Sequence, residues 1–406
     1  MSRFAYLPIA SPLHDAATVD RLTADIRTAL HDLDGVRAEH PEDHDDVPLA
    51  ILVATGGTEA AILDLVHRRH TVVPYEPVLL LAHPLHNSLP AALEALARLH
   101  MDGERGRIVQ IDSAASEQLA ITIADMTAIH RLHTTRLGVV GVPSDWLVAS
   151  VPDADLLRER WGVELVPIDI TGTIDAHAHA DPAATNAVAV RFAGTSAPTP
   201  ELVRSAALYP ALVATIEQAR VDAVTVRCFD FLTGLTTSGC VALAELNDRG
   251  VVAGCEGDVA SAVAMLLVRA LFDQPSWMAN PAHVDVDCNQ VLLAHCTVAP
   301  SLVEDIELHT HFESGLGIGL RGRFAPGWVT LLRLGGPSLN RMWIAEAEIA
   351  HTGSEPGLCR TQVTVRLDGV SAGSLLEDPL GNHLLMFHGR HRERIERWWQ
   401  LAFGSS

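Results

Sequence analysis

Short apolar runs bounded by polar residues, glycine or proline recur in the first part of the chain. Such runs predict buried strands, here at residues 4–10, 49–54, 78–82 and 108–111. Helical patterns lie between them. Asn87 gives an N-cap signal and Pro90 an early helical position before an Ala/Leu-rich stretch that reaches His100. We therefore expect an α/β layer that ends near residue 112.

A second alternation of strands and helices follows a crossover helix expected at residues 114–133. Its strands are expected at residues 137–142, 163–168, 223–226 and 251–255. After about Pro275 the runs are short and alternating, with Gly/Pro turns, at residues 291–294, 306–312, 327–334, 342–349 and 361–367. This pattern indicates antiparallel β structure, as a barrel or a sandwich. A last helix is expected at residues 392–401.

Composition narrows the classes of function. A chain of 406 residues exceeds the usual size of one core, so several domains are expected. The net charge of -21 disfavours a nucleic-acid partner, because few basic groups are left over to neutralise phosphates. All 29 basic residues are arginine. Without lysine, neither a Schiff base nor a Walker A phosphate loop can form.

Cysteine usage and hydropathy bear on the compartment. The six cysteines contain no C-x-x-C pair, and the first residues show no charged-then-apolar leader. The longest apolar stretches are shorter than the ~20 residues that span a bilayer. We therefore expect a cytoplasmic protein with reduced thiols and no membrane role.

Glu256 is the most informative candidate for chemistry. It follows the apolar run 251–255 and precedes a long apolar helical stretch, so it lies at the carboxyl end of an expected parallel strand. Ligands bind outside such strand ends in open α/β sheets. His295 and His383 come from two other segments. One carboxylate and two imidazoles could hold a divalent metal.

Three other motifs admit competing interpretations. His177 and His179 form the H-x-H pattern of metal-dependent amidohydrolases, but the flanking residues favour a solvated loop. Residues 317–322 match a dinucleotide fingerprint, yet a β-rich segment follows where a helix is required. In residues 306–313, alternation places His311 and Glu313 on a face that lines a polar pocket or meets water.

Several strings along the chain together resemble the L-fucose isomerase and L-arabinose isomerase superfamily, in particular its shorter members. They are residues 54–59, 81–90, 228–230, 254–258, 293–297, 311–315, 359–362 and 381–383. The resemblance implies two Rossmann-like parallel-sheet domains and a C-terminal antiparallel β-barrel. It also implies Mn²⁺ as the usual ion and a homo-oligomer with active sites near subunit contacts. Carboxylate and imidazole donors favour Mn²⁺ or Zn²⁺, so Zn²⁺ is the second candidate. The expected domains are residues 1–134, 135–276 with Glu256, and 277–406 with His295 and His383.

The resemblance also implies roles for single residues. Glu256 matches the first catalytic carboxylate, and His295 and His383 match metal-binding imidazoles. Where the superfamily has its second carboxylate this chain has Asn280, which can ligate a metal but cannot act as a base. A substitute acid or base is needed, from Asp285, Asp287, His311 or a water; Asp287 is our first choice.

The leading hypothesis is a metal-dependent aldose–ketose isomerase of a monosaccharide or modified sugar. Its reaction passes through an enediol, with Glu256 and Asp287 as catalytic groups. The metal ligands are Glu256, Asn280, His295 and His383, and the expected substrate contacts are His311, Glu313 and Arg227. Two alternatives stay open: a metal-dependent C–C lyase on the same scaffold, and a non-catalytic sugar-binding protein.

Overall fold

A computed structural model describes residues 3–111 and 117–404 of the chain. The chain forms two compact units, which we describe separately. The first unit contains Met1–His133 and Glu393–Ser406, and the second contains Thr134–Arg392. The division expected from the sequence, at residues 134 and 276, stays a prediction.

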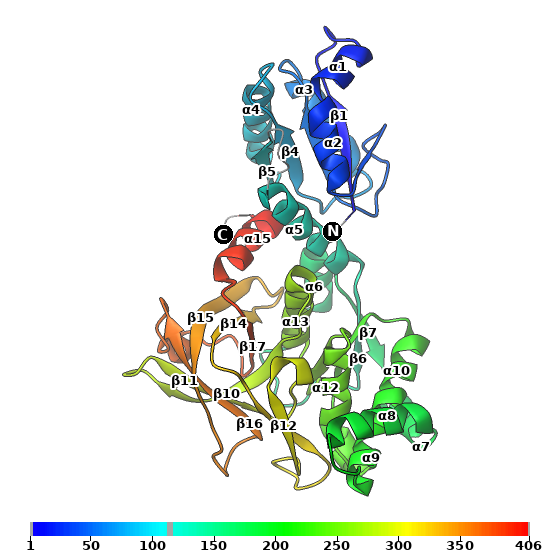
Figure 1. The fold of residues 1–406 in the computed structure, drawn as a ribbon, viewed down its shortest axis with the longest axis vertical. Coiled ribbons are helices and arrows are strands. Elements are labelled where there is room, and N and C mark those ends of the chain that lie inside the picture. Colours follow the sequence, from blue (N-terminus) through cyan, green and yellow to red (C-terminus); the bar gives the residue numbers. More distant parts are fainter. Residues whose placement is uncertain (1–2, 112–116, 405–406) are drawn as a thin grey trace. The chain divides into compact units, whose positions relative to one another are not determined.

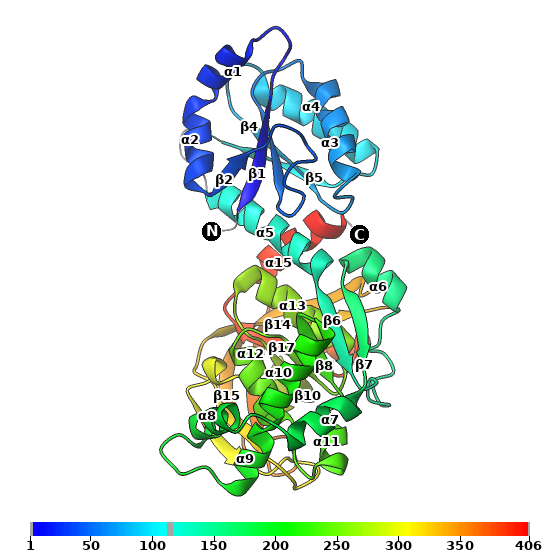
Figure 2. The same ribbon diagram turned by 90° about the vertical axis from the view of Figure 1, so that its right-hand side faces the viewer.

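The first unit is built on a parallel sheet with the strand order β2-β1-β3-β4-β5. The strands are β1 (Phe4–Ile9), β2 (Gly35–Arg37), β3 (Leu49–Val53), β4 (Val78–Ala82) and β5 (Gly106–Gln110). Every residue of β3 and β4 is buried, because helices cover both faces of a parallel sheet. Figure 2 shows α1 and α2 on one side of this sheet and α3 and α4 on the other.

The helices of this unit follow the sheet in the usual alternation. They are α1 (Ala16–Leu22), α2 (Ala24–Asp32), α3 (Glu59–His70), α4 (Ser88–Met101), α5 (Glu117–Thr134) and α15 (Arg392–Phe403). The helix start expected at residue 114 lies outside the described residues. The expected strands and the expected helices at residues 90–100 and 392–401 are confirmed. Helices α1 and α2 have no comparable signal in the sequence, because helices of seven and nine residues show little hydrophobic periodicity.

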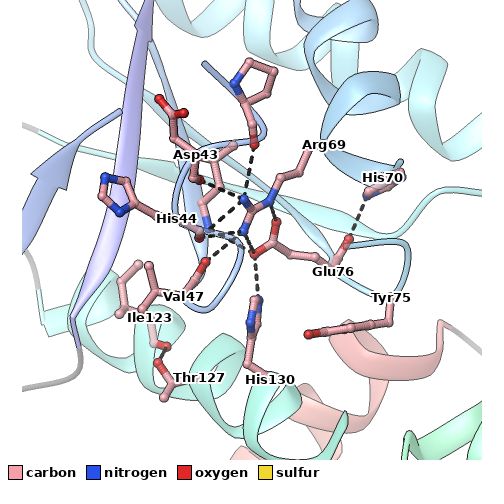
Figure 3. Close-up of polar contacts among 12 residues, drawn as sticks. Asp43, His44, Val47, Arg69, His70, Tyr75, Glu76, Ile123, Thr127 and His130 are labelled. Carbon is pink, nitrogen blue, oxygen red and sulfur yellow. Dashed lines mark hydrogen bonds and ion pairs between the residues drawn. The ribbon is translucent and has the colours of Figure 1, made fainter. Parts of the chain in front are cut away.

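A buried polar network links three elements of the first unit (Figure 3). Arg69, in α3, donates from Nε to Glu76 at 2.6 Å, and His130, in α5, lies 2.7 Å from the other carboxylate oxygen. The remaining guanidinium hydrogens reach backbone carbonyls, including those of Pro41 and Val47. Every charge in the network has partners, as buried charges require.

The second unit contains a parallel sheet with the strand order β7-β6-β8-β9. Its strands are β6 (Arg136–Val140), β7 (Glu164–Ile168), β8 (Ala223–Val226) and β9 (Ala253–Cys255). Its helices are α6 (Ala154–Trp161), α7 (Ile170–Ala178), α8 (Pro182–Ala193), α9 (Pro200–Ala206), α10 (Leu208–Ala219), α11 (Phe229–Gly234), α12 (Cys240–Asp248) and α13 (Val259–Phe272). All four strands were expected from the sequence.

A closed antiparallel barrel follows, with the order β10-β11-β16-β15-β14-β17 (Figure 1). Its strands are β10 (Trp277–Asp285), β11 (Gln290–His295), β14 (Trp328–Gly335), β15 (Arg341–Thr352), β16 (Thr361–Asp368) and β17 (Leu384–His388). The short elements around it are β12 (Asp305–His309), β13 (Gly319–Arg323), the 3₁₀ turn Pro300–Leu302 and α14 (Ser374–Glu377). The expected fold class, two parallel-sheet α/β parts and a C-terminal β-barrel, is confirmed.

Three features differ from the strand pattern expected after about Pro275, and the first is that β17 was not expected at all. Strand β10 escapes the pattern because Pro281 interrupts it and the pairing with β11 shifts register after that residue. The run at residues 306–312 is shorter than expected and pairs with β13 in a separate two-stranded sheet. Of the two architectures expected from the sequence, a barrel and a sandwich, the structure shows the barrel.

Helix α13 connects the two layers of the second unit. It packs against β8 and β9 of the parallel sheet and against β14 and β17 of the barrel. Its sequence is apolar almost all round, as a helix buried on several sides requires. The N-terminus of α13 thereby lies where the strand end of the sheet meets the barrel. Within the described residues, no helix is both long and apolar enough to cross a bilayer.

Candidate metal centre

Glu256 occupies a tight turn at the carboxyl end of β9. Its φ of 64° is left-handed, and Gly257 follows with a φ of 74°. A Cβ on Gly257 would lie 2.8 Å from Cα of Pro143, so only glycine fits there. Left-handed backbone is costly for a residue with a side chain, and such strain concentrates at functional sites. The turn directs Glu256 away from the sheet.

The barrel delivers the two imidazoles from two strands, β11 and β17. His295 is the last residue of β11, and His383 directly precedes β17. Strand β10 lies between these two strands and pairs with both. In it, Asn280 pairs with Ala294, and Ala279 pairs with Leu384. The register therefore places Asn280 beside the residues that carry both imidazoles.

The structure brings Glu256, His295 and His383 together, and we call them the Glu–His–His cluster. Glu256 Oε1 lies 3.7 Å from His295 Nε2 and 3.6 Å from His383 Nε2. One ligand atom from each of the three residues lies within 4.8 Å of the other two, and all three residues are buried. Among the described residues, no other group of three or more His, Cys, Asp or Glu side chains has that geometry.

In the cluster, the charged forms of Glu256 and His383 are favoured over their neutral forms. Burial disfavours the charged form of Glu256, but His295 and His383 outweigh burial and hold the pKa of that carboxyl well below its usual range. Burial likewise opposes the charge on His383, yet its contacts with Asp258 and Glu256 prevail and raise the pKa of His383 to about 9. Two anionic carboxylates therefore adjoin these imidazoles, an environment that favours a cation.

The cluster fits a divalent metal ion by its donor set. His383 Nε2 is completely buried and has no hydrogen-bond partner among the described residues. An orphaned buried nitrogen is rare and calls for a ligand or ion. Carboxylate and imidazole donors suit Mn²⁺ and Zn²⁺, and a dication would balance the two carboxylates. A metal site is therefore the arrangement that satisfies these atoms together.

An aromatic wall adjoins the cluster. The Trp146 indole donates from Nε1 to Glu256 Oε2 at 2.6 Å. Phe229 stands edge-on to Trp146 and to His311, at ring-centroid distances of 5.1 and 5.5 Å. Burial, aided by the charges of His295 and Arg360, lowers the pKa of His311 to about 4. His311 is therefore a neutral imidazole beside the cluster.

The loop that carries Trp146 is tied to the sheet by Arg227. The Arg227 guanidinium donates to Pro143 O at 2.9 Å and pairs with Asp145 at 3.1 Å and Asp230 at 3.2 Å. Ser144 N also donates to Glu256 O at 2.9 Å. Arg227 thus lies near the cluster, and its contacts with Pro143 and Asp145 hold the loop that carries Trp146.

Two of the expected site residues are exposed in turns. Asp287 is exposed in the turn of the β10–β11 hairpin, at the opposite end of β11 from His295. Six residues of strand separate these ends by roughly 17 Å. The structure thus does not bring Asp287 to the cluster. Glu313 is exposed in the turn after β12, two residues beyond the buried His311.

The competing motifs resolve into ordinary structure. Residues 170–178 form α7 rather than the solvated loop expected, because Asp169 caps the helix by accepting from Thr171 N. His177, in α7, lies 2.9 Å from Arg204 O and outside the Glu–His–His cluster. Residues 319–323 are β13, followed by β14, so no helix N-terminus follows the glycines. This context is wrong for a dinucleotide site.

Sequence reasoning missed the roles of Trp146 and Asp258. Trp146 lies 110 positions from Glu256, and no local pattern relates the two residues. Asp258 was visible in the string 254–258, and its place before an apolar helical run is an N-cap signal. Its 2.8 Å contact with His383 Nδ1 depends on the tertiary fold.

Known proteins add an independent comparison. No family model matches the chain. The chain is 26% identical over 225 residues to the sulfoquinovose isomerase of Clostridium sp. (strain MSTE9), covering 52% of the chain and 50% of that protein. It is 24% identical over 237 residues to the sulfoquinovose isomerase of Alkalicoccus urumqiensis, covering 55% and 53%. The chain thus spans about half the length of the curated relatives it matches.

Proposed function

We propose that this protein is a metal-dependent aldose–ketose isomerase that acts on a monosaccharide or modified sugar. The observation that carries the proposal is the buried Glu–His–His cluster at the carboxyl end of β9. The similarity to proteins named sulfoquinovose isomerase supports the same class of reaction. Mn²⁺ is the first candidate for the ion and Zn²⁺ the second.

Isomerisation of an aldose to a ketose moves a proton between two adjacent carbons through an enediol. Glu256 is the proposed base, and the hydrogen bond from Trp146 fixes its carboxylate with Oε1 toward the imidazoles. His295 and His383 are the proposed metal ligands. A divalent cation bound there supplies stabilisation of negative charge on the substrate oxygens.

A second acid or base must complete the proton transfer, and we propose His311 for it. The position of Asp287 in a distant exposed turn argues against our first choice. His311 is buried beside Phe229, and its Nδ1 lies 3.0 Å from Ser314 Oγ. That contact engages Nδ1, so Nε2 is the nitrogen that would exchange a proton with the sugar. Asn280 is the proposed fourth metal ligand, through its carbonyl oxygen.

One arginine suggests how an anionic sugar would bind. Arg360 donates to Thr310 O at 2.7 Å and to Thr310 Oγ1 at 3.2 Å, and its charge acts on His311. Within the described part of the chain it has no carboxylate partner, whereas Arg227 has two. We propose Arg360 as the contact for the sulfonate of a substrate such as sulfoquinovose. Arg227 and Glu313 stay proposed contacts for sugar hydroxyl groups.

The loop beside the cluster also suggests a homo-oligomer. Val142 is 63% exposed, Trp146 50% and Val148 91%. Apolar side chains gathered on a surface commonly mark a protein contact. We propose that a second copy of the chain covers this loop. A monomer by light scattering at the concentrations used for assay would contradict it.

The direct test incubates pure protein and Mn²⁺ with a panel of aldoses, ketoses and sulfoquinovose. We expect conversion of an aldose to its ketose at constant carbon number. We also expect Glu256→Gln to lower kcat by roughly 10²–10⁴-fold, the usual contribution of a general base. Arg360→Gln should raise KM for sulfoquinovose while leaving KM for neutral sugars unchanged.

The same assay separates the two alternatives. Products with fewer carbons would indicate a metal-dependent C–C lyase instead. Sugar affinity without any turnover, unaffected by Glu256→Gln, would indicate a sugar-binding protein. Either result would overturn the isomerase proposal.

A further inference from the structure

Asp258 divides its two carboxylate oxygens between two tasks. It is the N-cap of α13, and Oδ1 accepts from Ser261 N at 2.7 Å. Oδ2 lies 2.8 Å from His383 Nδ1. The Asp258 side chain is 0% exposed, so both contacts are shielded from water. The turn of Glu256 is therefore linked through Asp258 to the imidazole that comes from the barrel.

The contact with Asp258 determines which nitrogen of His383 carries the proton. An ionised carboxylate can only accept hydrogen bonds, so His383 must donate from Nδ1. When His383 is neutral, its lone pair is then on Nε2. Nε2 is the buried nitrogen 3.6 Å from Glu256 Oε1 that has no hydrogen-bond partner among the described residues.

The second imidazole of the cluster is held differently. His295 Nδ1 accepts from Thr297 N at 3.3 Å, which is a long bond to a backbone donor. A neutral His295 in that contact carries its proton on Nε2, so it must give up the contact to ligate a metal through Nε2. Only His383 is already prepared as a ligand by its neighbour.

A buried arginine fixes Asp258 in turn. Arg333, on β14, lies 3.2 Å from Asp258 Oδ2 and donates to Ser261 Oγ at 2.8 Å and Ser150 Oγ at 2.6 Å. A Cβ at Gly381 would lie 2.2 Å from Arg333 Nη2, so a glycine is required two residues before His383. The arginine therefore compensates the buried charge and sets the path of the chain that leads to His383.

We propose that Asp258 is a positioning residue that holds His383 in the orientation and tautomer needed to ligate a divalent cation through Nε2. The inference rests on the proposed metal centre and adds to it the residue that prepares the site. Carboxylate partners of metal-binding histidines typically contribute 10–100-fold, as an order of magnitude, to metal affinity.

Two variants separate positioning from helix capping. Asp258→Ser keeps a good N-cap residue but removes the acceptor for His383. We expect Asp258→Ser to weaken Mn²⁺ affinity by roughly 10–100-fold. Asp181→Ser, at the exposed N-cap of α8, controls for the cap substitution.

Mn²⁺ affinity is measured by competition with a chelator, without any substrate. Equal affinities in wild type and Asp258→Ser, or an equal loss in both Asp258→Ser and Asp181→Ser, would overturn the inference. A wild type that binds no divalent cation would instead overturn the proposed metal centre itself.

A second measurement needs no variant at the network. In Zn²⁺-loaded wild type with ¹⁵N-labelled histidine, the His383 resonances are those lost in His383→Gln. We expect a proton on Nδ1 and none on Nε2. A proton on Nε2, with Nδ1 as the ligand, contradicts the role of Asp258 even if Asp258→Ser fails to fold.

Discussion

Trp146 Nε1 donates a hydrogen bond to Glu256 Oε2 at 2.6 Å, which leaves Oε1 as the oxygen that faces the two imidazoles. The two residues come from loops that follow different strands, β6 and β9. A carboxylate held by one oxygen has a fixed direction for the other. The proposed base of the reaction is thus oriented before any substrate binds.

Trp146→Phe should therefore reduce catalysis while keeping the ring against Phe229. A hydrogen bond to a charged group contributes about 1.5–3 kcal/mol, so we expect kcat to fall by roughly 10–100-fold. Trp343→Phe is the matched control, because Trp343 Nε1 donates to Ser374 Oγ at 2.9 Å in the barrel. Unchanged steady-state kinetics of Trp146→Phe would refute the orienting role.

Divalent metal should stabilise the protein through the Glu–His–His cluster. An ion that binds only the folded state, present at 100 times its Kd, adds about 2.7 kcal/mol. We expect Mn²⁺ to raise the midpoint of the thermal melt in wild type and to leave His383→Ala unchanged. His309→Ala, at a half-exposed histidine paired with Glu307, should respond like wild type. A rise in His383→Ala equal to that in wild type would place the ion elsewhere.

The buried network of the first unit should govern its stability in acid. Burial opposes the charge on Glu76, but His130 and Arg69 outweigh it and hold the pKa of Glu76 below its ordinary value. A carboxyl with a depressed folded pKa adds stability above its unfolded pKa, and that stability is lost as the pH falls through the folded pKa. Denaturant unfolding of wild type should therefore show this loss in the acid range.

Glu76→Gln should lower stability at neutral pH by about 3–5 kcal/mol, because it leaves Arg69 buried without its carboxylate. Its stability should also depend less on pH. Glu42→Gln is the matched control, since Glu42 pairs with the neighbouring Arg68 at the surface. Surface pairs contribute little, so this variant should resemble wild type. Equal effects of the two variants would show that the buried network has no special role.

The histidines of α7 should be dispensable for metal binding. His177 contacts a backbone carbonyl, and the Glu–His–His cluster contains neither His177 nor His179. We expect the double variant His177→Ala, His179→Ala to keep wild-type Mn²⁺ affinity. Loss of metal in the double variant alone would favour an amidohydrolase-type site over the proposed one.

The sequence predicted most of the parallel strands because they are continuous apolar runs, and most of the barrel because its strands alternate between apolar and polar residues. Strands such as Leu49–Val53 and Val78–Ala82 are buried on both faces and read as continuous apolar runs. Strand β10 could not be recognised, because Pro281 and a register shift break its alternation. Helix α7 was taken for a loop, since Thr171 and Gly172 in its first turn are poor helix formers and hid the Asp169 cap signal.

For the site, the three cluster residues were predictable from short strings with recognisable context. The partners that orient them were not, since Trp146 and Arg333 reach Glu256 and Asp258 only through the tertiary fold. Asp287 was chosen for its chemistry, and nothing in the local sequence indicated that the hairpin would carry it away from His295. Residue type identifies candidate acids and bases, but their distance from the Glu–His–His cluster decides which of them can act there.

The central claim is that Glu256, His295 and His383 hold one divalent ion. Anomalous diffraction from crystals grown with Mn²⁺, collected on both sides of the manganese absorption edge, tests it most directly. The account predicts a single strong peak within bonding distance of Glu256 Oε1 and His383 Nε2, with a ring nitrogen of His295 completing the set. Absence of a peak among these three side chains, with manganese bound at another place, would contradict it.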